Sequence, residues 1–172
     1  FKPEYIYKIS RQDPELADDI LVVGYPGFDG KDYNTTVKVH KGIVSSLSGF
    51  DNDLTRFQVD AVLMGGNSGG PIINDYGNVV GVAVAGLVTL ITPIHLVQLF
   101  KGKPVAFEQG TVNFGVRGSV LQGLLKSQGI RIEPPYQRKI PKDRLRNIIN
   151  GATYYLKCFK TGARLKAESR GN

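Results

Sequence analysis

The chain has 172 residues, a length that suits one domain or one domain with an appendage, and a formal net charge of +7. No apolar run is long enough to span a bilayer, and the single cysteine, Cys158, excludes an intrachain disulfide while leaving the cellular compartment open. The charge is uneven, because residues 1–137 sum to −1 and residues 138–172 sum to +8. A basic tail can attract nucleic acid or an anionic surface, but it is more often a solvated face. Nucleic acid is therefore the less favoured partner.

The first 90 residues predict short strands separated by glycine-containing turns. Apolar runs and period-two alternation indicate strands at residues 20–25, 35–40, 41–46, 57–62, 72–73 and 79–86. The last two strands flank a turn at residues 75–78, which is typical of a hairpin. No regular alternation of strand and helix occurs before residue 90. This spacing predicts an all-β antiparallel barrel or sandwich.

After residue 90 the pattern changes to a mixture of helices and strands. Residues 92–100 could begin a helix, with Thr92 as its cap and Pro93 in its first turn. Residues 113–116 predict a strand, and residues 119–129 predict a helix closed by Gly129. After a Pro-Pro linker, residues 142–150 predict an amphipathic helix and residues 152–159 a strand.

The most informative motif is Gly65-Gly66-Asn67-Ser68-Gly69-Gly70-Pro71, which sets one serine among four glycines. Glycine accepts positive φ angles and adds no side chain, so peptide N–H groups around Ser68 can turn toward a common point. That arrangement builds an oxyanion hole beside a nucleophilic hydroxyl. A glycine-rich hairpin loop with an incidental serine is the alternative interpretation.

Several further motifs, taken in order along the chain, resemble those of trypsin-like serine proteases of the HtrA/Deg type. They are Gly24-Tyr25-Pro26, Gly42-Ile43-Val44-Ser45, Gln58-Val59-Asp60-Ala61 before the serine loop, and Asn113-Phe114-Gly115-Val116. The resemblance covers residues 15–130 and implies a six-stranded Greek-key barrel, the second barrel of a chymotrypsin-like fold, closed by a terminal helix. Residues 1–14 would form an inter-barrel segment, 87–110 an insertion and 131–172 a basic C-terminal extension.

The resemblance also implies roles for individual residues, all in binding or cleaving a peptide or protein substrate. Ser68 would be the nucleophile, and the backbone N–H groups of Gly66 and Ser68 would hold the oxyanion. The substrate-binding residues would be Val62, Val84, Ala85 and Gly86. Because Val62 lies six positions before the serine, where the floor of the specificity pocket is set, small or medium aliphatic side chains would be preferred. Asn67 replaces the Asp of digestive members, which argues against activation by a buried new N-terminus.

The chain departs from the family in lacking an evident general base, without which a serine hydroxyl is a poor nucleophile. In the chymotrypsin fold the order is His, Asp, then Ser, and the first two belong to the first barrel. His40 lies in a predicted strand and His95 in the apparent insertion, so both are interpreted as structural. We therefore expect the chain to begin just after the catalytic Asp, to require the missing N-terminal barrel, and to be inactive alone.

Two other interpretations remain open. Residues 66–70 also satisfy the G-x-S-x-G elbow of α/β-hydrolases, and Ser68, Asp75 and His95 follow the order of such a triad, although that elbow requires a helix after the serine. Alternatively, the chain is a non-catalytic protease-like module whose basic tail binds nucleic acid or another partner. No Cys/His spacing suits a metal and no phosphate-binding loop is present, so no cofactor is expected.

Overall fold

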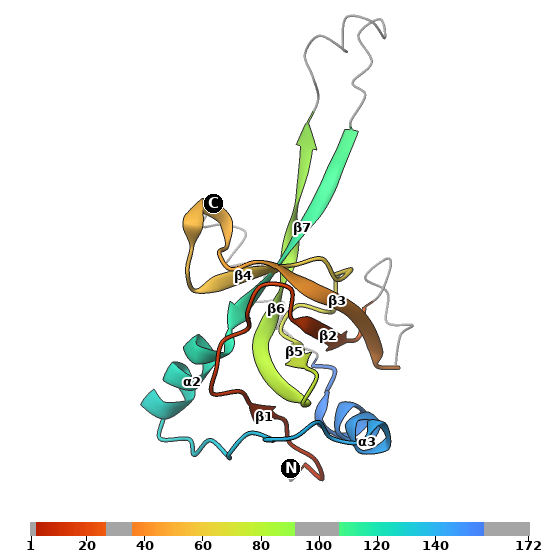
Figure 1. The fold of residues 1–172 in the computed structure, drawn as a ribbon. Helices are drawn as coiled ribbons and strands as arrows, with labels where there is room; N and C mark the ends of the chain where they lie inside the picture. Colours follow the sequence, from red (N-terminus) through yellow and green to blue (C-terminus); the bar gives the residue numbers. More distant parts are fainter. Residues whose placement is uncertain (1–2, 27–35, 92–106, 157–172) are drawn as a thin grey trace, which may run out of the picture.

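The structure, a computed structural model, describes residues 3–26, 36–91 and 107–156 (Figure 1). Strands dominate these ranges, and two α-helices follow the last strand. The strands are β1 (Lys8–Ile9), β2 (Asp19–Gly24), β3 (Lys38–Ser46), β4 (Arg56–Val59), β5 (Pro71–Asn74), β6 (Asn78–Ile91) and β7 (Phe107–Arg117). The helices are the short 3-10 helix η1 (Phe50–Asn52), α2 (Gly118–Ser127) and α3 (Lys142–Ala152). Within the described ranges, no helix combines the length and the apolar character needed to cross a membrane.

Six of the strands close into a barrel. The order β6-β5-β2-β3-β4-β7 is antiparallel throughout, and β7 pairs back onto β6. The short β1 adds in parallel to β6. The predicted all-β, six-stranded antiparallel barrel of chymotrypsin-like type is therefore confirmed, with one extra strand and a terminal helix.

The inside of the barrel is filled by the side chains that alternate inward along each strand. In β2, Ile20 and Val22 point into this core, whereas Val23 belongs to a second cluster outside the barrel. Phe57 is the largest fully buried side chain, and its ring lies against the backbone of Gly81 and Gly115, where a Cβ atom would come within 2.6 Å of it. The inner core consists of Ile20, Val22, Val44, Phe57, Val59, Ala61, Ile72, Val80 and Ala83.

The outer cluster joins the barrel to the segments that follow it. Val23, Ile73 and Val79 of the barrel pack with Ile9 of β1 and with Ile149 of α3, and all five are buried. Leu121 and Leu125 of α2 and Leu145 of α3 pack against the same cluster. The described part of the predicted C-terminal extension is thus part of the packed structure rather than a loose tail.

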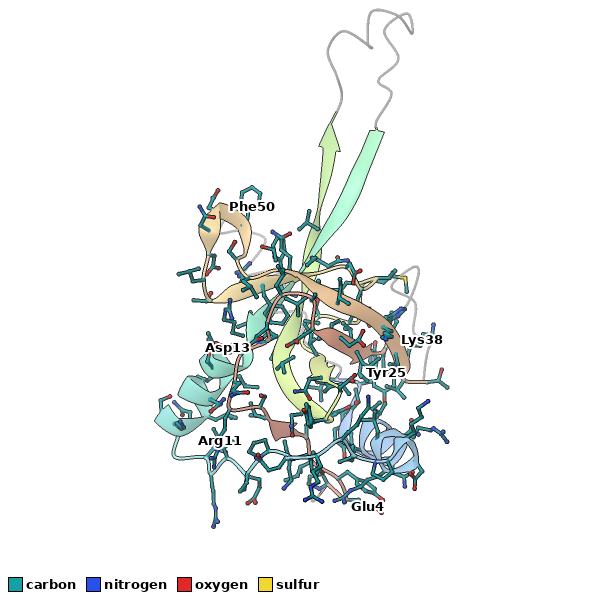
Figure 2. The ribbon with its side chains drawn as sticks, in the orientation of Figure 1. Glu4, Arg11, Asp13, Tyr25, Lys38 and Phe50 are labelled. Atoms are coloured by element: carbon teal, nitrogen blue, oxygen red, sulfur yellow. The ribbon has the colours of Figure 1, made fainter. Side chains whose placement is uncertain are left out.

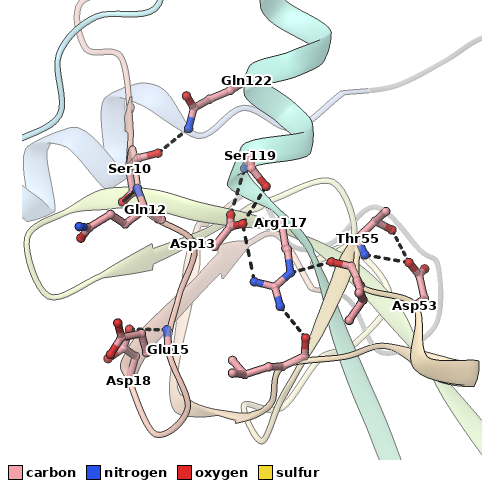
Figure 3. A network of polar contacts seen from close by, with 12 residues as sticks. Ser10, Gln12, Asp13, Glu15, Asp18, Asp53, Thr55, Arg117, Ser119 and Gln122 are labelled. Carbon is pink, nitrogen blue, oxygen red and sulfur yellow. Dashed lines mark hydrogen bonds and ion pairs between the residues drawn. The ribbon is translucent and has the colours of Figure 1, made fainter.

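A polar network ties the N-terminal segment to the start of α2 (Figure 3). The Asp13 carboxylate accepts hydrogen bonds from the backbone N–H of Ser119 (3.2 Å) and from its hydroxyl (2.8 Å). It also lies 3.7 Å from Nη1 of Arg117, whose other guanidinium nitrogens donate to the carbonyl oxygens of Leu47 and Leu54. A carboxylate at a helix N-terminus satisfies free N–H groups and interacts favourably with the helix dipole.

Most predicted elements are present, with shifted boundaries. The helix predicted at residues 119–129 is α2, and Gly129 after it has a φ of +69°. The helix at residues 142–150 is α3, and the strand at 113–116 lies within β7. The helix predicted at residues 92–100 lies outside the described residues.

Two predictions of strands are wrong. The separate strands predicted at 35–40 and 41–46 are, in the described part, the single strand β3, because Gly42 continues the ladder by pairing with Ile20 of β2. The strand predicted at 152–159 is not formed in its described part, where Ala152 ends α3 and residues 153–156 have no regular structure. The polar groups of Thr153 are bonded to two tyrosine hydroxyls instead of to a neighbouring strand.

Strands β6 and β7 continue together beyond the barrel as a two-stranded arm (Figure 1). Their pairing extends from Gly81 with Arg117 to Ile91 with Phe107, with shifts of register between Val84 and Leu87 and between Val88 and Leu90. The described parts of the predicted insertion at residues 87–110 are thus strand.

Candidate active site

Ser68 lies in the loop between β4 and β5, and this loop is held to its neighbours through the backbone. The N–H of Tyr25, just after β2, donates to the carbonyl of Gly66 at 3.1 Å. Toward β6, the N–H of Gly69 donates to the carbonyl of Ala83 and the N–H of Ala83 to the carbonyl of Gly70, each at 2.8 Å. Ser68 is exposed at the tip of this pinned segment. Its hydroxyl is therefore presented to solvent from a fixed backbone.

The glycines of the loop are required by two different constraints. Gly66 and Gly69 have φ angles of +103° and +83°, which residues with a Cβ atom rarely adopt. Gly66 and Gly70 also approach the backbone of β2 and its extension: a Cβ atom on Gly66 would lie 2.2 Å from the Tyr25 carbonyl oxygen, and one on Gly70 would lie 2.1 Å from that of Val23. Positive φ thus accounts for Gly69, close packing on neighbouring backbone accounts for Gly70, and both apply to Gly66.

Two backbone N–H groups at the serine differ from their neighbours in their hydrogen bonds within the described part of the chain. The N–H groups of Asn67, Gly69 and Gly70 donate to carbonyl oxygens of Met64, Ala83 and Asn67 at 2.8 to 3.0 Å. Among the hydrogen bonds between described residues, none uses the N–H of Gly66 or of Ser68. These are the two groups predicted to form the oxyanion hole.

Asn67, directly before the serine, is fully buried beneath the loop. A Cβ atom on Gly24 would lie 2.8 Å from its Oδ1 atom, so the amide packs closely against the end of β2. Neither amide atom has a hydrogen-bond partner within the described part of the chain. A carboxylate in this place would be a buried charge, which is far more costly than a neutral amide.

The structure does not bring a base to Ser68 among the residues it describes. His40 pairs with Val22 in the ladder of β3 with β2, and its buried Nε2 has no hydrogen-bond partner there. Asp75 forms an exposed ion pair with Lys139 at 2.6 Å, and His95 lies outside the described residues. The segment after Ser68 is strand β5 rather than a helix, so the α/β-hydrolase elbow is excluded.

The residues predicted to bind substrate lie before the serine loop and in strand β6. Val62 precedes the serine loop and is 58% exposed, and Val84 is half-buried in β6 opposite Phe114. Ala85 and Gly86 occupy the shift of register between Val84 and Leu87, where the ladder with β7 is interrupted. A shift of this kind is typical of a β-bulge, which disrupts the ladder locally.

An open groove of about 650 Å³ begins at Ser68 and is lined mainly by apolar and aromatic side chains. No local sequence pattern indicated that Tyr7 and Tyr25 would line this groove together with the segment after α3. Burial raises the pKa of the Tyr7 hydroxyl above its usual value, so it remains a neutral hydrogen-bonding group at physiological pH. The lining residues are Tyr7, Ile9, Gly24, Tyr25, Gly66, Ser68, Gly69, Gly70, Pro71, Val79, Val82, Leu121, Ala152, Thr153, Tyr154, Tyr155 and Leu156.

In the described ranges, no group of three His, Cys, Asp or Glu side chains is placed to hold a metal ion. The chemistry available at this site is that of a serine hydroxyl beside two backbone N–H donors.

The barrel and its serine loop are those of a trypsin-like peptidase domain. Residues 5–82 match the family model described as a trypsin-like peptidase domain. Protease Do-like 2, chloroplastic, from Arabidopsis thaliana is 45% identical over 76 residues, which are 41% of this chain and 12% of that protein. The serine protease HtrA-like of Staphylococcus haemolyticus is 41% identical over 78 residues, 39% of this chain and 12% of that protein. The matched part of the chain is thus similar to trypsin-like serine proteases of the HtrA-like type, as its motifs predict.

Similarity also extends beyond the matched domain. The uncharacterized protein y4bJ of Sinorhizobium fredii is 33% identical over 126 residues, which cover 72% of this chain and 18% of that protein. The serine endoprotease from Yersinia pestis aligns in structure with a TM-score of 0.47 and 21% identity, covering 70% of this chain and 34% of that one. This chain spans between 12% and 18% of the length of these curated relatives.

Proposed function

We propose that this chain carries the nucleophile-bearing part of a trypsin-like serine endopeptidase. Ser68 Oγ would attack the carbonyl carbon of a peptide bond, and its proton would pass to a general base. The resulting oxyanion would accept hydrogen bonds from the N–H groups of Gly66 and Ser68. The leaving amine would depart with a proton, and water would then release the acyl group from Ser68.

The observation that carries this proposal is which backbone N–H groups of the serine loop are hydrogen-bonded to described residues and which are not. Three neighbouring N–H groups are bonded to carbonyl oxygens, whereas those of Gly66 and Ser68 are bonded to no described residue. Losing one oxyanion donor typically costs about 10²- to 10³-fold in rate, so two positioned donors represent a large share of such catalysis. Val62 and the interrupted ladder at Ala85 and Gly86 are proposed to contact the substrate on the acyl side of the scissile bond.

The test is labelling with a fluorophosphonate probe in a longer protein that contains this chain together with an upstream His and Asp. We expect the probe to modify Ser68 and to leave the Ser68→Ala variant unlabelled. A folded wild-type protein that stays unlabelled would be a pseudoenzyme, and the proposal would be wrong.

We further propose that the 172-residue chain does not hydrolyse peptides by itself. His40 makes no hydrogen bond to Ser68, so the serine proton has no acceptor among the described side chains. The base would come from an N-terminal barrel of the same protein, in the order known for this fold. Turnover by the isolated chain that the Ser68→Ala change abolishes would refute this statement.

A second candidate function is a binding module that uses the basic C-terminal region. Helix α3 supports it, because Lys142, Arg144 and Arg146 are all exposed on this helix. Binding to RNA or DNA that weakens with salt and is lost when residues 138–172 are deleted is the result expected of this function. Binding that survives the deletion would dispose of it.

A further inference from the structure

Another cavity, of about 330 Å³, lies at the end of β5 that points away from the serine loop. Residues 10–12 after β1, the turn between β5 and β6, and residues 135–137 after α2 each form one side of it (Figure 1). Strand β5 runs from Pro71, just after Ser68, to Asn74, so roughly 10 Å of strand separates this hairpin cavity from the serine loop. It shares no lining residue with the groove at Ser68.

The wall formed by residues 135–137 is fixed to the barrel by Asn78, which is only 3% exposed. Its Nδ2 atom donates to the Tyr136 carbonyl oxygen at 2.9 Å, and its Oδ1 atom accepts from the Tyr136 N–H at 2.8 Å. Next to the cavity, Lys139 and Asp75 form an exposed ion pair at 2.6 Å. The segment between α2 and α3 is therefore held against the turn between β5 and β6, and the cavity is a fixed feature of the described structure.

The polar groups of the hairpin cavity offer donors rather than acceptors. The Oδ1 atom of Asn74 already accepts hydrogen bonds from the N–H groups of Tyr76 and Asn78, each at 3.1 Å. Arg11 follows β1 in the N-terminal segment and is exposed (Figure 2). Among the hydrogen bonds and ion pairs between described residues, none uses the Asn74 amide nitrogen or the Arg11 guanidinium. A ligand rich in acceptor atoms suits this lining.

Positive charge prevails around the hairpin cavity. No Asp or Glu of the described chain lines it, and the neighbouring Asp75 is already paired with Lys139. The Nζ atom of Lys8 and the guanidinium carbon of Arg144 lie 5.0 Å and 5.4 Å from the ring centroid of Tyr136, which lines the cavity. Neither cation forms an ion pair with a carboxylate of the described residues. An approaching anion would therefore meet positive charge that no nearby carboxylate balances.

A carboxylate fits these groups better than a phosphate. Arg11 is the one cation among the described lining residues, and its planar guanidinium can bond both oxygens of a carboxylate at once. A phosphate group carries about two negative charges near neutral pH, which one guanidinium balances only in part. The volume is at the lower end of the range for small-ligand pockets, which suits a single side chain.

We propose that the hairpin cavity is a recognition site for an acidic side chain, Asp or Glu, of a peptide or protein partner. Arg11 is its ionic contact and Asn74 supplies an amide donor. Lys8 and Arg144 attract the ligand at longer range without touching it. The site goes beyond the proposed peptidase function, because it lies at the other end of β5 from Ser68 and takes no part in turnover.

An NMR titration of the 172-residue chain tests this assignment. Two short blocked peptides would be compared, identical except for Glu or Gln at one central position. We expect the Glu peptide to shift amide resonances of residues 10–12, 74–78 and 135–137. The Gln peptide should bind about 10-fold more weakly, because it lacks the charge-assisted hydrogen bonds. Equal binding of the two peptides, or no shift at these residues with the Glu peptide, would overturn the inference.

Arginine substitutions provide a matched control. Arg11 and Arg131 are both exposed, but only Arg11 lines the hairpin cavity. Arg11→Gln should weaken binding of the Glu peptide by about 10-fold, and Arg131→Gln should leave it unchanged. Arg11→Lys keeps the charge but loses the planar fork, so its affinity should fall between the two. Equal effects of Arg11→Gln and Arg131→Gln would contradict the assignment, because general attraction by surface charge would then explain the binding.

Competition separates a carboxylate site from a phosphate site. Inorganic phosphate and a short single-stranded RNA would be added to the complex with the Glu peptide. We expect neither to displace the peptide at concentrations equal to that of the peptide. Displacement by either, with shifts at residues 10–12 and 74–78, would assign the site to phosphate and overturn the inference.

A longer protein that contains this chain tests whether the hairpin cavity is open there. A fluorescent form of the Glu peptide should bind that protein and the 172-residue chain with similar affinity, measured by fluorescence anisotropy. Loss of binding in the longer protein would show that another of its segments occupies the cavity, and the inference would be wrong. Labelling of Ser68 is a separate measurement, so the outcome for the peptidase function does not depend on this one.

Discussion

Alanine substitution of three loop glycines would separate the two constraints on the Ser68 loop. Gly69 has a φ of +83° but open space where its Cβ would be, so Gly69→Ala tests backbone strain alone. Gly70 has no positive φ, but its Cβ would lie 2.1 Å from the Val23 carbonyl oxygen, so Gly70→Ala tests the close approach alone. Gly66 combines a φ of +103° with a Cβ position 2.2 Å from the Tyr25 carbonyl oxygen.

The expected magnitudes follow from these distances and angles. A residue with a Cβ atom at positive φ costs about 1 to 2 kcal/mol of free energy of unfolding, which is the loss expected for Gly69→Ala. A methyl group forced against backbone costs about 1 to 3 kcal/mol, the loss expected for Gly70→Ala. Gly66→Ala should show both effects, for a loss of about 2 to 5 kcal/mol.

Urea unfolding followed by circular dichroism measures these losses, because the chain contains no tryptophan to report by fluorescence. The three variants should rank with Gly66→Ala as the least stable. If Gly66→Ala and Gly69→Ala lost the same free energy within about 0.5 kcal/mol, the contact with Tyr25 would not constrain the loop and the reasoning would be refuted.

Three further predictions concern the barrel and its attached segments. Burial raises the pKa of Tyr7 in the folded state, so the stability that its neutral hydroxyl contributes is present below the unfolded pKa near 10 and is lost as pH rises through the folded pKa. Between pH 8 and pH 11, the free energy of unfolding should therefore fall less for Tyr7→Phe than for wild type. Phe57→Ala empties the centre of the inner core and should lower the free energy of unfolding by about 3 to 5 kcal/mol in urea; a loss below 1 kcal/mol would mean that the core repacks. Asp13→Asn removes the carboxylate at the start of α2 and should lower the free energy of unfolding in urea by about 1 kcal/mol; an unchanged value would show that this carboxylate does not stabilise the start of the helix.

The barrel and the serine loop were predictable because their signals are local. Alternation along β2 separates Ile20 and Val22 from Val23, and this pattern can be read within a few residues. Of the glycines around Ser68, Gly66 and Gly70 likewise mark a backbone under close approach. The continuity of β3 through Gly42 was not predictable, because Gly42 resembles a strand break until its partner Ile20 is known.

The C-terminal side of the groove could not be predicted from local pattern. Residues 152–156 contain tyrosine and leucine, which favour strands, but no neighbouring strand is available to them within the described fold. The contacts that decide their conformation join Thr153 to Tyr7 and Tyr25, 146 and 128 positions away in sequence. Contacts at such separation override intrinsic propensity and leave no periodic signature.

The arm formed by β6 and β7 has a consequence for how the molecule opens. Up to Val84 and Phe114, both strands belong to the closed barrel, whereas from Leu87 with Val112 outward the described residues pair only with each other. A two-stranded ribbon is marginally stable alone in water. Amide hydrogens of the arm should therefore exchange with solvent through local fraying, while those of the barrel wait for global unfolding. The boundary between these two regimes lies at the shift of register that holds Ala85 and Gly86.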